Sequence, residues 1–70
     1  MVIDSTFATP VNQTALTQGA DIVLHSATKY LAGHNDCLAG AICGSAEMIS
    51  KVRDLHAILG GVLDPHAAYL

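Results

Sequence analysis

The segment His25–Lys29 (His-Ser-Ala-Thr-Lys) carries the side chains in this sequence that are best suited to chemistry. Ser26 and Thr28 are two residues apart, so in an extended segment their hydroxyls would point the same way and Lys29 would point roughly opposite. Two hydroxyls suit a phosphate, and an adjacent amine suits a carbonyl group on the same small molecule. An apolar run precedes the segment, and ligands of open α/β sheets bind beyond the carboxyl ends of the strands.

A carboxylate completes this set of groups. Asp4 ends an earlier apolar run and lies 25 positions before Lys29 (29 minus 4). If the two runs form parallel strands, both residues emerge at the same edge of the sheet. A carboxylate, a phosphate cradle and an imine-forming lysine are the three features that pyridoxal 5′-phosphate (PLP) requires. The acid keeps the ring nitrogen protonated, and the lysine binds the aldehyde and later carries protons.

Each of these residues also has a structural explanation that needs no cofactor. A lysine at the end of a strand is more often a solvated side chain. Serine and threonine in such a segment usually cap the local backbone, and Asp4 taken alone is typical of a turn. Residue types and spacing by themselves therefore leave both interpretations open.

The elements expected around these residues follow a strand–helix–strand pattern. The apolar run 2–4 predicts a short strand. Thr9–Pro10 predicts the start of a helix over 11–18, which Gly19 ends. Three large aliphatic residues in succession within 21–25 predict a strand that is covered on both faces. Strand, helix and strand within about 25 residues predict a right-handed crossover and a parallel pair.

The second half of the chain predicts one more strand and two more helices. We expect a loop over 30–36 and a strand of small residues over 38–43. Ser45 can cap the next helix, which Gly60–Gly61 ends. Asp64–Pro65 begins a further helix, which we interpret as truncated. The capped helix carries an apolar stripe that is expected to lie in the core: Met48, Ile49, Val52, Leu55 and Leu59.

The histidines and cysteines offer a zinc site as a weaker alternative. The four candidate ligands are His25, His34, Cys37 and Cys43. Their spacing fits no compact zinc finger, so we assign no metal ligand. We expect Cys37 and Cys43 to share a strand face as buried thiols. Structural roles are expected for His25 and Asp36.

Composition excludes several classes of protein. The chain has 70 residues and a formal charge of −3, with 51% apolar and 13% charged residues. Three basic residues form no stripe for nucleic acid or an anionic membrane, and no apolar run approaches the roughly 18 residues of a membrane span. We expect neither a secretory signal nor a disulfide framework. Typical domains are about 25% charged, so residues 1–70 are expected to be a fragment of one larger domain, truncated at both ends.

Three stretches of the sequence resemble the cofactor-lysine region of the cystathionine γ-synthase family, the Cys/Met-metabolism enzymes of PLP fold type I. They are Ile3–Pro10 (IDSTFATP), Gly19–Tyr30 (GADIVLHSATKY) and Gly33–Asp36 (GHND), and the resemblance continues through 59–61 and 64–70. It implies an α/β fold. The chain would be a partial segment of the large, PLP-binding domain of the aspartate aminotransferase-like type, with a mainly parallel sheet and flanking helices.

The resemblance also implies roles for individual residues. Lys29 corresponds to the lysine that binds the cofactor as a Schiff base, and Asp4 to the partner of its ring nitrogen. Ser26 and Thr28 correspond to the hydroxyls that bind its phosphate. Thr6 matches a family threonine near the ring, to which we assign no separate role.

Within the family, residues 8–13 and 35–40 look closest to the plant-type γ-synthases. These enzymes replace the γ-substituent of an activated homoserine with the thiol of cysteine, which gives cystathionine on the route to methionine. The resemblance implies a homotetramer, located in plastids if plant-type and otherwise in the cytoplasm. Two alternatives remain: a γ-lyase or homoserine-ester sulfhydrylase of the same family, and an inactive truncated chain. Ser5 departs from the usual Asn and Cys37 from the usual aliphatic residue, and neither departure affects the proposed contacts.

Overall fold

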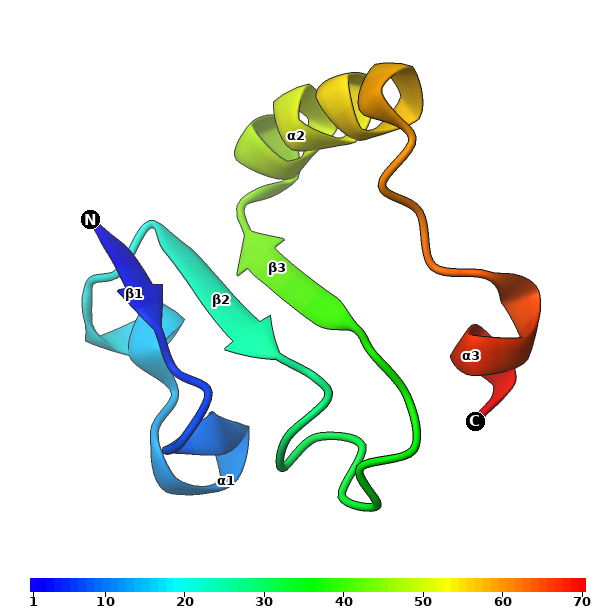
Figure 1. Ribbon diagram of the computed structural model, residues 1–70. Helices are drawn as coiled ribbons and strands as arrows, with labels where there is room; N and C mark the ends of the chain where they lie inside the picture. Colours follow the sequence, from blue (N-terminus) through cyan, green and yellow to red (C-terminus); the bar gives the residue numbers. More distant parts are fainter.

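The computed structural model describes all 70 residues as a three-stranded sheet with flanking helices (Figure 1). The elements in chain order are β1 (Val2–Asp4), α1 (Thr9–Asn12), the 3-10 helix η1 (Ala15–Gln18), β2 (Ile22–Ser26), β3 (Gly40–Gly44), α2 (Ala46–Leu59) and α3 (Pro65–Tyr69). The predicted α/β class is thus observed. None of the helices has both the length and the apolar character that crossing a membrane requires.

The sheet has the order β1-β2-β3 and contains both kinds of strand pairing. β1 and β2 are parallel, with Asp4 beside Leu24, so the predicted parallel pair is confirmed. β3 runs antiparallel to β2, with Val23 beside Cys43, and the segment is therefore mixed rather than mainly parallel. The connection between β2 and β3 contains no helix. A chain that returns without a crossover helix pairs antiparallel.

The prediction of one continuous helix over 11–18 is wrong, because the segment forms two short helices. The chain forms α1 and then η1, with an extended residue, Gln13, at the end of α1. The hydroxyls of Thr14 and Thr17 lie 2.9 Å apart, and Thr17 Oγ1 also donates to the Thr14 carbonyl at 2.7 Å. Threonine hydroxyls that bond to nearby groups compete with helical backbone bonds. The predicted stop is confirmed, because Gly19 adopts a left-handed conformation with φ of 103°.

The predicted caps of the two later helices are confirmed. Ser45 Oγ accepts a hydrogen bond from the Met48 amide at 3.3 Å, at the start of α2. Gly60 ends α2 with φ of 79°. Asp64 Oδ1 accepts from the Ala67 amide at 2.9 Å and starts α3. These helix ends depend on one to three neighbouring residues, so local sequence is sufficient to place them.

The buried core is small and lies between η1 and β2. It consists of Ala15, Ala20 and Val23, with Ile3 packed against them. β2 is buried on the face that carries Val23 and half-buried on the other, so the strand is not covered on both faces as expected.

The apolar stripe of α2 does not lie in the core of this chain, contrary to prediction. No residue of α2 is buried. Ile49 and Val52 are half-buried, whereas Met48, Leu55 and Leu59 are 38%, 60% and 81% exposed. The helix contacts mainly β3, and a three-stranded sheet is too narrow to cover the whole length of the stripe.

β3 begins later than predicted, which also corrects the prediction for the cysteines. The strand starts at Gly40 rather than residue 38 and extends to Gly44. Cys37 therefore precedes the strand and is half-buried, whereas Cys43 lies within it and is exposed. The two thiols do not share a buried strand face.

The Ser45 cap can be tested in the full protein that contains this chain. We expect Ser45→Ala to lower the free energy of unfolding by about 1 kcal/mol, because the Met48 amide loses its partner. The matched control is Ser50→Ala, at an exposed position inside α2, which should leave stability unchanged or slightly raised. Urea denaturation of both variants checks this, and equal effects of the two substitutions would contradict the capping role.

Candidate active site

The parallel pairing of β1 and β2 brings Asp4 and Ser26 to the same edge of the sheet. Asp4 ends β1 beside Leu24, and the Ser5 amide donates to the Leu24 carbonyl at 2.9 Å. Ser26 is the last residue of β2. Asp4 and Ser26 line one groove of about 410 Å³, which His56 of α2 helps to close. The two residues that are 22 positions apart (26 minus 4) in the sequence thus face a common space.

The chain turns immediately after β2, so Thr28 and Lys29 lie in a turn and not in an extended segment. The Lys29 amide donates to the Ser26 carbonyl at 3.2 Å, and the Gly33 amide donates to the Lys29 carbonyl at 2.9 Å. The predicted alternation of Ser26, Thr28 and Lys29 across a strand is therefore wrong. The physical reason is that the ladder with β3 ends at Ser26. Beyond it the Thr28 amide still donates to the Ala39 carbonyl at 3.3 Å, whereas the Lys29 amide bonds back to Ser26 and closes a turn.

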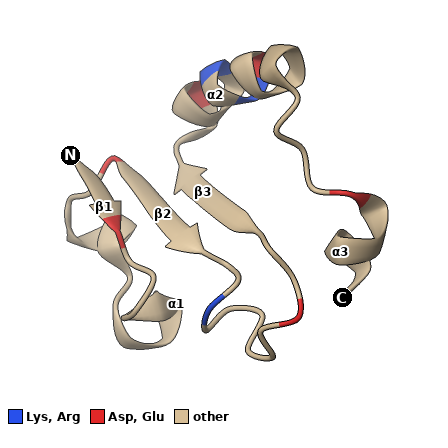
Figure 2. Ribbon diagram, viewed as in Figure 1, with Lys and Arg blue, Asp and Glu red and all other residues tan.

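The Lys29 side chain is exposed and makes no hydrogen bond or ion pair within the chain. The other two basic residues lie on α2, whereas a single basic segment follows β2 (Figure 2). The turn that carries Lys29 is held near the segment after β1, because the rings of Tyr30 and Phe7 meet edge to face with centroids 6.1 Å apart. The structure thus leaves a free amine close in sequence to Ser26, although Lys29 does not line the groove of Asp4 and Ser26.

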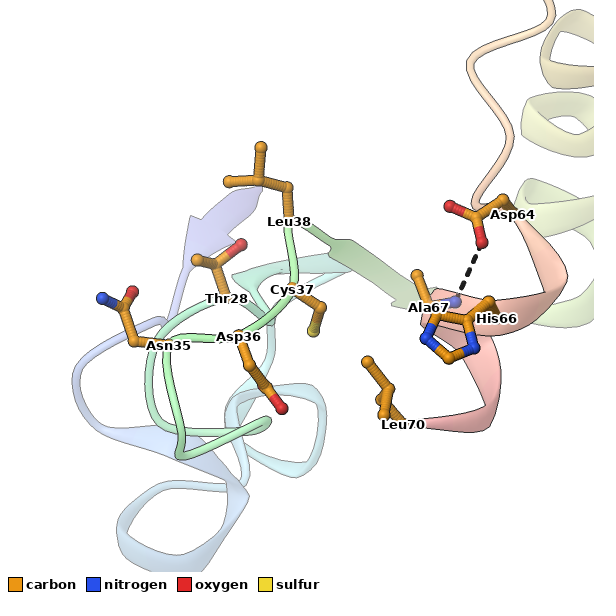
Figure 3. A pocket seen from close by; sticks show the side chains of 9 residues that line it. All are labelled: Thr28, Asn35, Asp36, Cys37, Leu38, Asp64, His66, Ala67 and Leu70. Atoms are coloured by element: carbon orange, nitrogen blue, oxygen red, sulfur yellow. Dashed lines mark hydrogen bonds between the residues drawn. The ribbon is translucent and has the colours of Figure 1, made fainter.

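Thr28 anchors the turn to the chain that enters β3. Its Oγ1 accepts from the Ala39 amide at 2.9 Å and donates a long hydrogen bond, 3.4 Å, to the Ala39 carbonyl. A bond of this length is weak, so a stronger acceptor can displace the carbonyl from the hydroxyl proton. Thr28 lines a different cavity, of about 500 Å³, between the 35–38 loop and α3 (Figure 3). In this structure Thr28 and Ser26 do not share one cavity.

The Asp4 carboxylate is held in its ionised form by two hydrogen bonds from one residue. Asp4 Oδ1 accepts from the Thr6 hydroxyl at 2.6 Å and from the Thr6 amide at 3.1 Å. The hydroxyl, followed by the amide, holds the pKa of Asp4 below 3.8, against a smaller opposing effect of desolvation. His25 adds a further electrostatic lowering of this pKa. Asp4 is therefore negative at neutral pH, and its second oxygen, Oδ2, makes no hydrogen bond within the chain.

Thr6 also forms a hydrogen bond with the end of β2, a contact that was not predicted from the sequence. Its Oγ1 accepts from the Ser26 amide at 2.8 Å, so one hydroxyl touches both Asp4 and Ser26. The local part of this arrangement has a sequence signal, because an aspartate often accepts from the residue two positions later. The contact with Ser26 joins residues 20 positions apart, and no local pattern indicates it.

The chemical types of the four predicted residues fit PLP, although only Asp4 and Ser26 line one groove. The ring nitrogen needs an anion beside it, and Asp4 offers an ionised carboxylate with one free oxygen. The phosphate needs hydrogen-bond donors, and the Ser26 hydroxyl has no partner within the chain while Thr28 has a proton to donate. The aldehyde needs a primary amine, which Lys29 supplies.

Comparison with known proteins agrees with this chemistry. The sequence profile of the family described as "Cys/Met metabolism PLP-dependent enzyme" matches residues 1–70. The match therefore includes the strands, the turn after β2 and all the residues of the candidate site.

Individual relatives show two activities in their names. The chain is 66% identical, over 68 residues or 97% of its length, to cystathionine γ-synthase 1, chloroplastic, of Arabidopsis thaliana. It is equally similar to the protein of the same name from Nicotiana tabacum. It is 47% identical over 70 residues, its whole length, to L-methionine γ-lyase of Brevibacterium aurantiacum. The chain spans 12%, 13% and 17% of these three proteins.

The lowered pKa of Asp4 has a testable consequence for stability. A carboxyl whose pKa is lower in the folded state stabilises the fold above its ordinary pKa, and this contribution is lost as the pH falls through the lowered value. We expect Asp4→Ala to destabilise the cofactor-free full protein at neutral pH, and the difference from wild type to shrink only below the ordinary pKa of 3.8. Urea midpoints measured across pH check this.

The control for this measurement is Asp54→Ala. Asp54 is exposed on α2, and its side chain makes no hydrogen bond within the chain. This substitution should have no comparable effect at any pH. If the Asp4→Ala difference were absent at neutral pH, or disappeared well above 3.8, the Thr6 hydrogen bonds would not be stabilising the carboxylate.

Proposed function

The chain belongs to the Cys/Met metabolism PLP-dependent enzyme family, and from this premise we propose that it is part of the PLP-binding domain of a transsulfuration enzyme. The proposed reaction is the γ-replacement of an O-activated homoserine by cysteine, which yields cystathionine in methionine biosynthesis. The observation that favours this reaction is the 66% identity to two plant cystathionine γ-synthases, against 47% identity to a methionine γ-lyase over a similar length.

In this proposal Asp4 interacts with the ring nitrogen of the cofactor, and Lys29 binds its aldehyde group. The free Oδ2 of Asp4 would hold a proton on the ring nitrogen, and because its pKa is lowered Asp4 would be ionised throughout the neutral range. PLP, when bound, would supply an electron sink that makes proton loss from the amino-acid substrate accessible. Lys29 would hold the cofactor through its amine, and the same amine would serve as the base that moves protons at the substrate's carbon atoms.

Ser26 and Thr28 are proposed to donate hydrogen bonds to the phosphate. The Ser26 hydroxyl is unengaged, and the Thr28 hydroxyl donates only a long bond of 3.4 Å to the Ala39 carbonyl, which a phosphate oxygen would replace. Both donors are neutral, and the nearest basic residues in sequence other than Lys29 lie on α2. We therefore propose that the rest of the parent protein supplies the positive charge that a phosphate dianion needs.

The four proposed site residues do not distinguish a synthase from a γ-lyase or a homoserine-ester sulfhydrylase. All three reactions begin with the same ring chemistry and the same lysine. The difference lies in whether a thiol adds to the activated substrate, and this depends on contacts with the substrate's carboxylate and side chain. We propose that those contacts come from outside these 70 residues, with homoserine ester and cysteine as the substrates of the whole protein.

The isolated chain is proposed to have no catalytic activity of its own. Six of its 70 residues are buried, and its core contains only three side chains. Such a core contributes little against the conformational entropy of the chain. We propose that the active form is the full protein, assembled as a homotetramer. Its proposed location is the plastid, since two plant relatives are named as chloroplastic.

The covalent role of Lys29 can be tested by reductive trapping. We expect borohydride treatment of the full protein with PLP, followed by peptide mapping, to place the pyridoxyl label on Lys29. The visible absorbance band of the bound cofactor should be lost in Lys29→Ala and retained in Lys51→Ala, whose lysine is exposed on α2. The isolated 70-residue chain should show no such band. A label on a different lysine would refute the proposed site.

The reaction itself can be tested by product analysis. We expect the full protein, incubated with cysteine and an activated homoserine, to form cystathionine as the main product. Asp4→Asn should reduce this rate by at least tenfold, since a neutral partner no longer holds the proton on the ring nitrogen. Chromatography of cystathionine and of α-keto acid gives the measurement. Keto acid without cystathionine would identify a lyase and refute the synthase.

A further inference from the structure

We infer that Thr6 is a positioning residue for the cofactor, whose hydroxyl sets the placement of Asp4 relative to Ser26 at the edge of the sheet. This inference rests on the proposed function, in which Asp4 faces the ring nitrogen and Ser26 binds the phosphate. Those two contacts are made with two parts of one molecule, its pyridine ring and the phosphate ester attached to that ring. A residue that fixes their separation therefore affects how well both can be made at once.

The backbone alone does not fix this separation, because the ladder between β1 and β2 ends just before it. The last registered pair is Asp4 with Leu24, followed by the bond from the Ser5 amide to the Leu24 carbonyl. The Ser5 carbonyl accepts from the Thr9 amide at 3.0 Å. The Ser26 amide bonds instead to Thr6 Oγ1 at 2.8 Å. A side-chain oxygen thus takes the place of a ladder carbonyl.

The Thr6 hydroxyl makes one hydrogen bond as a donor, to Asp4, and one as an acceptor, from Ser26. It has one proton, which it donates to Asp4 Oδ1 at 2.6 Å, and it accepts from the Ser26 amide at 2.8 Å. The two bonds form a chain from an amide to a carboxylate, in which each bond polarises the other. Thr6 is only 9% exposed. Water therefore has little access to the position of the Thr6 hydroxyl, whereas the Asp4 carboxylate is exposed and can be hydrated on its other side.

Removing the hydroxyl has different consequences at the two ends. The Ser26 amide loses its partner at the point where the proposed phosphate-binding turn begins. Asp4 keeps only the bond from the Thr6 amide, so its pKa should rise towards the ordinary value and its carboxylate should rotate more freely. Both changes weaken contacts with the cofactor. In this proposal neither the hydroxyl nor the amide of Thr6 touches the cofactor itself.

The test uses the full protein with three substitutions at one position. Thr6→Val removes the hydroxyl and keeps the shape, and Thr6→Ser keeps the hydroxyl and removes the methyl group. Thr6→Cys supplies a thiol, a weaker donor and acceptor, and covers the case in which Thr6→Val does not fold. Thr17→Val is the matched control, because the Thr17 hydroxyl donates to the Thr14 carbonyl at 2.7 Å, on η1 and away from Asp4 and Ser26.

Two readouts separate positioning from a general loss of stability: the dissociation constant of PLP and hydrogen exchange at the Ser26 amide. We expect PLP to bind about tenfold more weakly or worse to Thr6→Val, as loss of a buried hydrogen bond to a charged group implies. Ser26 exchange should be faster in this variant. Thr6→Ser should remain close to wild type, Thr6→Cys should be intermediate, and Thr17→Val should be unchanged in both readouts.

Other outcomes would overturn the inference. Unchanged PLP affinity in Thr6→Val would refute it, as would equal weakening by Thr6→Ser and Thr6→Val, which would indicate packing of the methyl group instead. If Thr6→Val does not fold, wild-type affinity in Thr6→Cys would refute it. Borohydride labelling of Lys29 in the same samples separates the two proposals. Label on Lys29 with unchanged affinity removes only the role of Thr6, whereas label elsewhere removes both.

Discussion

The parallel alignment of β1 with β2 is the constraint on which the candidate site depends. It places the end of β1, at Asp4, beside the last part of β2, so that Asp4 and Ser26 line one groove. A one-residue slip in this register would turn Asp4 to the other face of the sheet. The short crossover through α1 and η1 maintains the register, because η1 packs against β2 through the small core of Ala15, Ala20 and Val23. This packing supports the backbone bonds between β1 and β2, and the Thr6 hydroxyl joins Asp4 to Ser26 beyond the end of the ladder.

At this edge of the sheet the Asp4 carboxylate is stabilised by neutral hydrogen-bond donors and not by an ion pair. Asp4 owes its lowered pKa first to the Thr6 hydroxyl and then to the Thr6 amide, with His25 as a lesser contributor. The carboxylate keeps one oxygen free, which a basic side chain in a salt bridge would have occupied. The exposed amine of Lys29 lies on a turn that is fastened by backbone hydrogen bonds and by the Tyr30–Phe7 ring contact.

The distribution of apolar side chains supports the proposal that this segment functions within a larger domain. The helix α2 has Leu55, Ile58 and Leu59 between 60% and 81% exposed, although their spacing is that of a buried stripe. The cavity that Thr28 lines is separate from the groove of Asp4 and Ser26. The exposed apolar stripe agrees with this proposal, because the chain spans only 12% to 18% of the length of the relatives that it matches.

Several helix ends and the parallel strand pair could be predicted from the sequence alone. The helix ends at Gly19, Ser45 and Asp64 were predicted correctly, because a cap or a left-handed glycine depends only on its immediate neighbours. The parallel pair was predictable from the two apolar runs and the crossover between them. The types of residue that could bind PLP were also evident from the sequence, although their roles remain proposals.

The direction of β3, the exposure of α2 and the turn that carries Thr28 and Lys29 depend on the tertiary structure. So does the bond from the Ser26 amide to Thr6, between residues 20 positions apart. Each of these features depends on which backbone groups find partners across the sheet, and on how much surface the remaining elements can cover. Such partners are distant in the sequence, so no local pattern contains them.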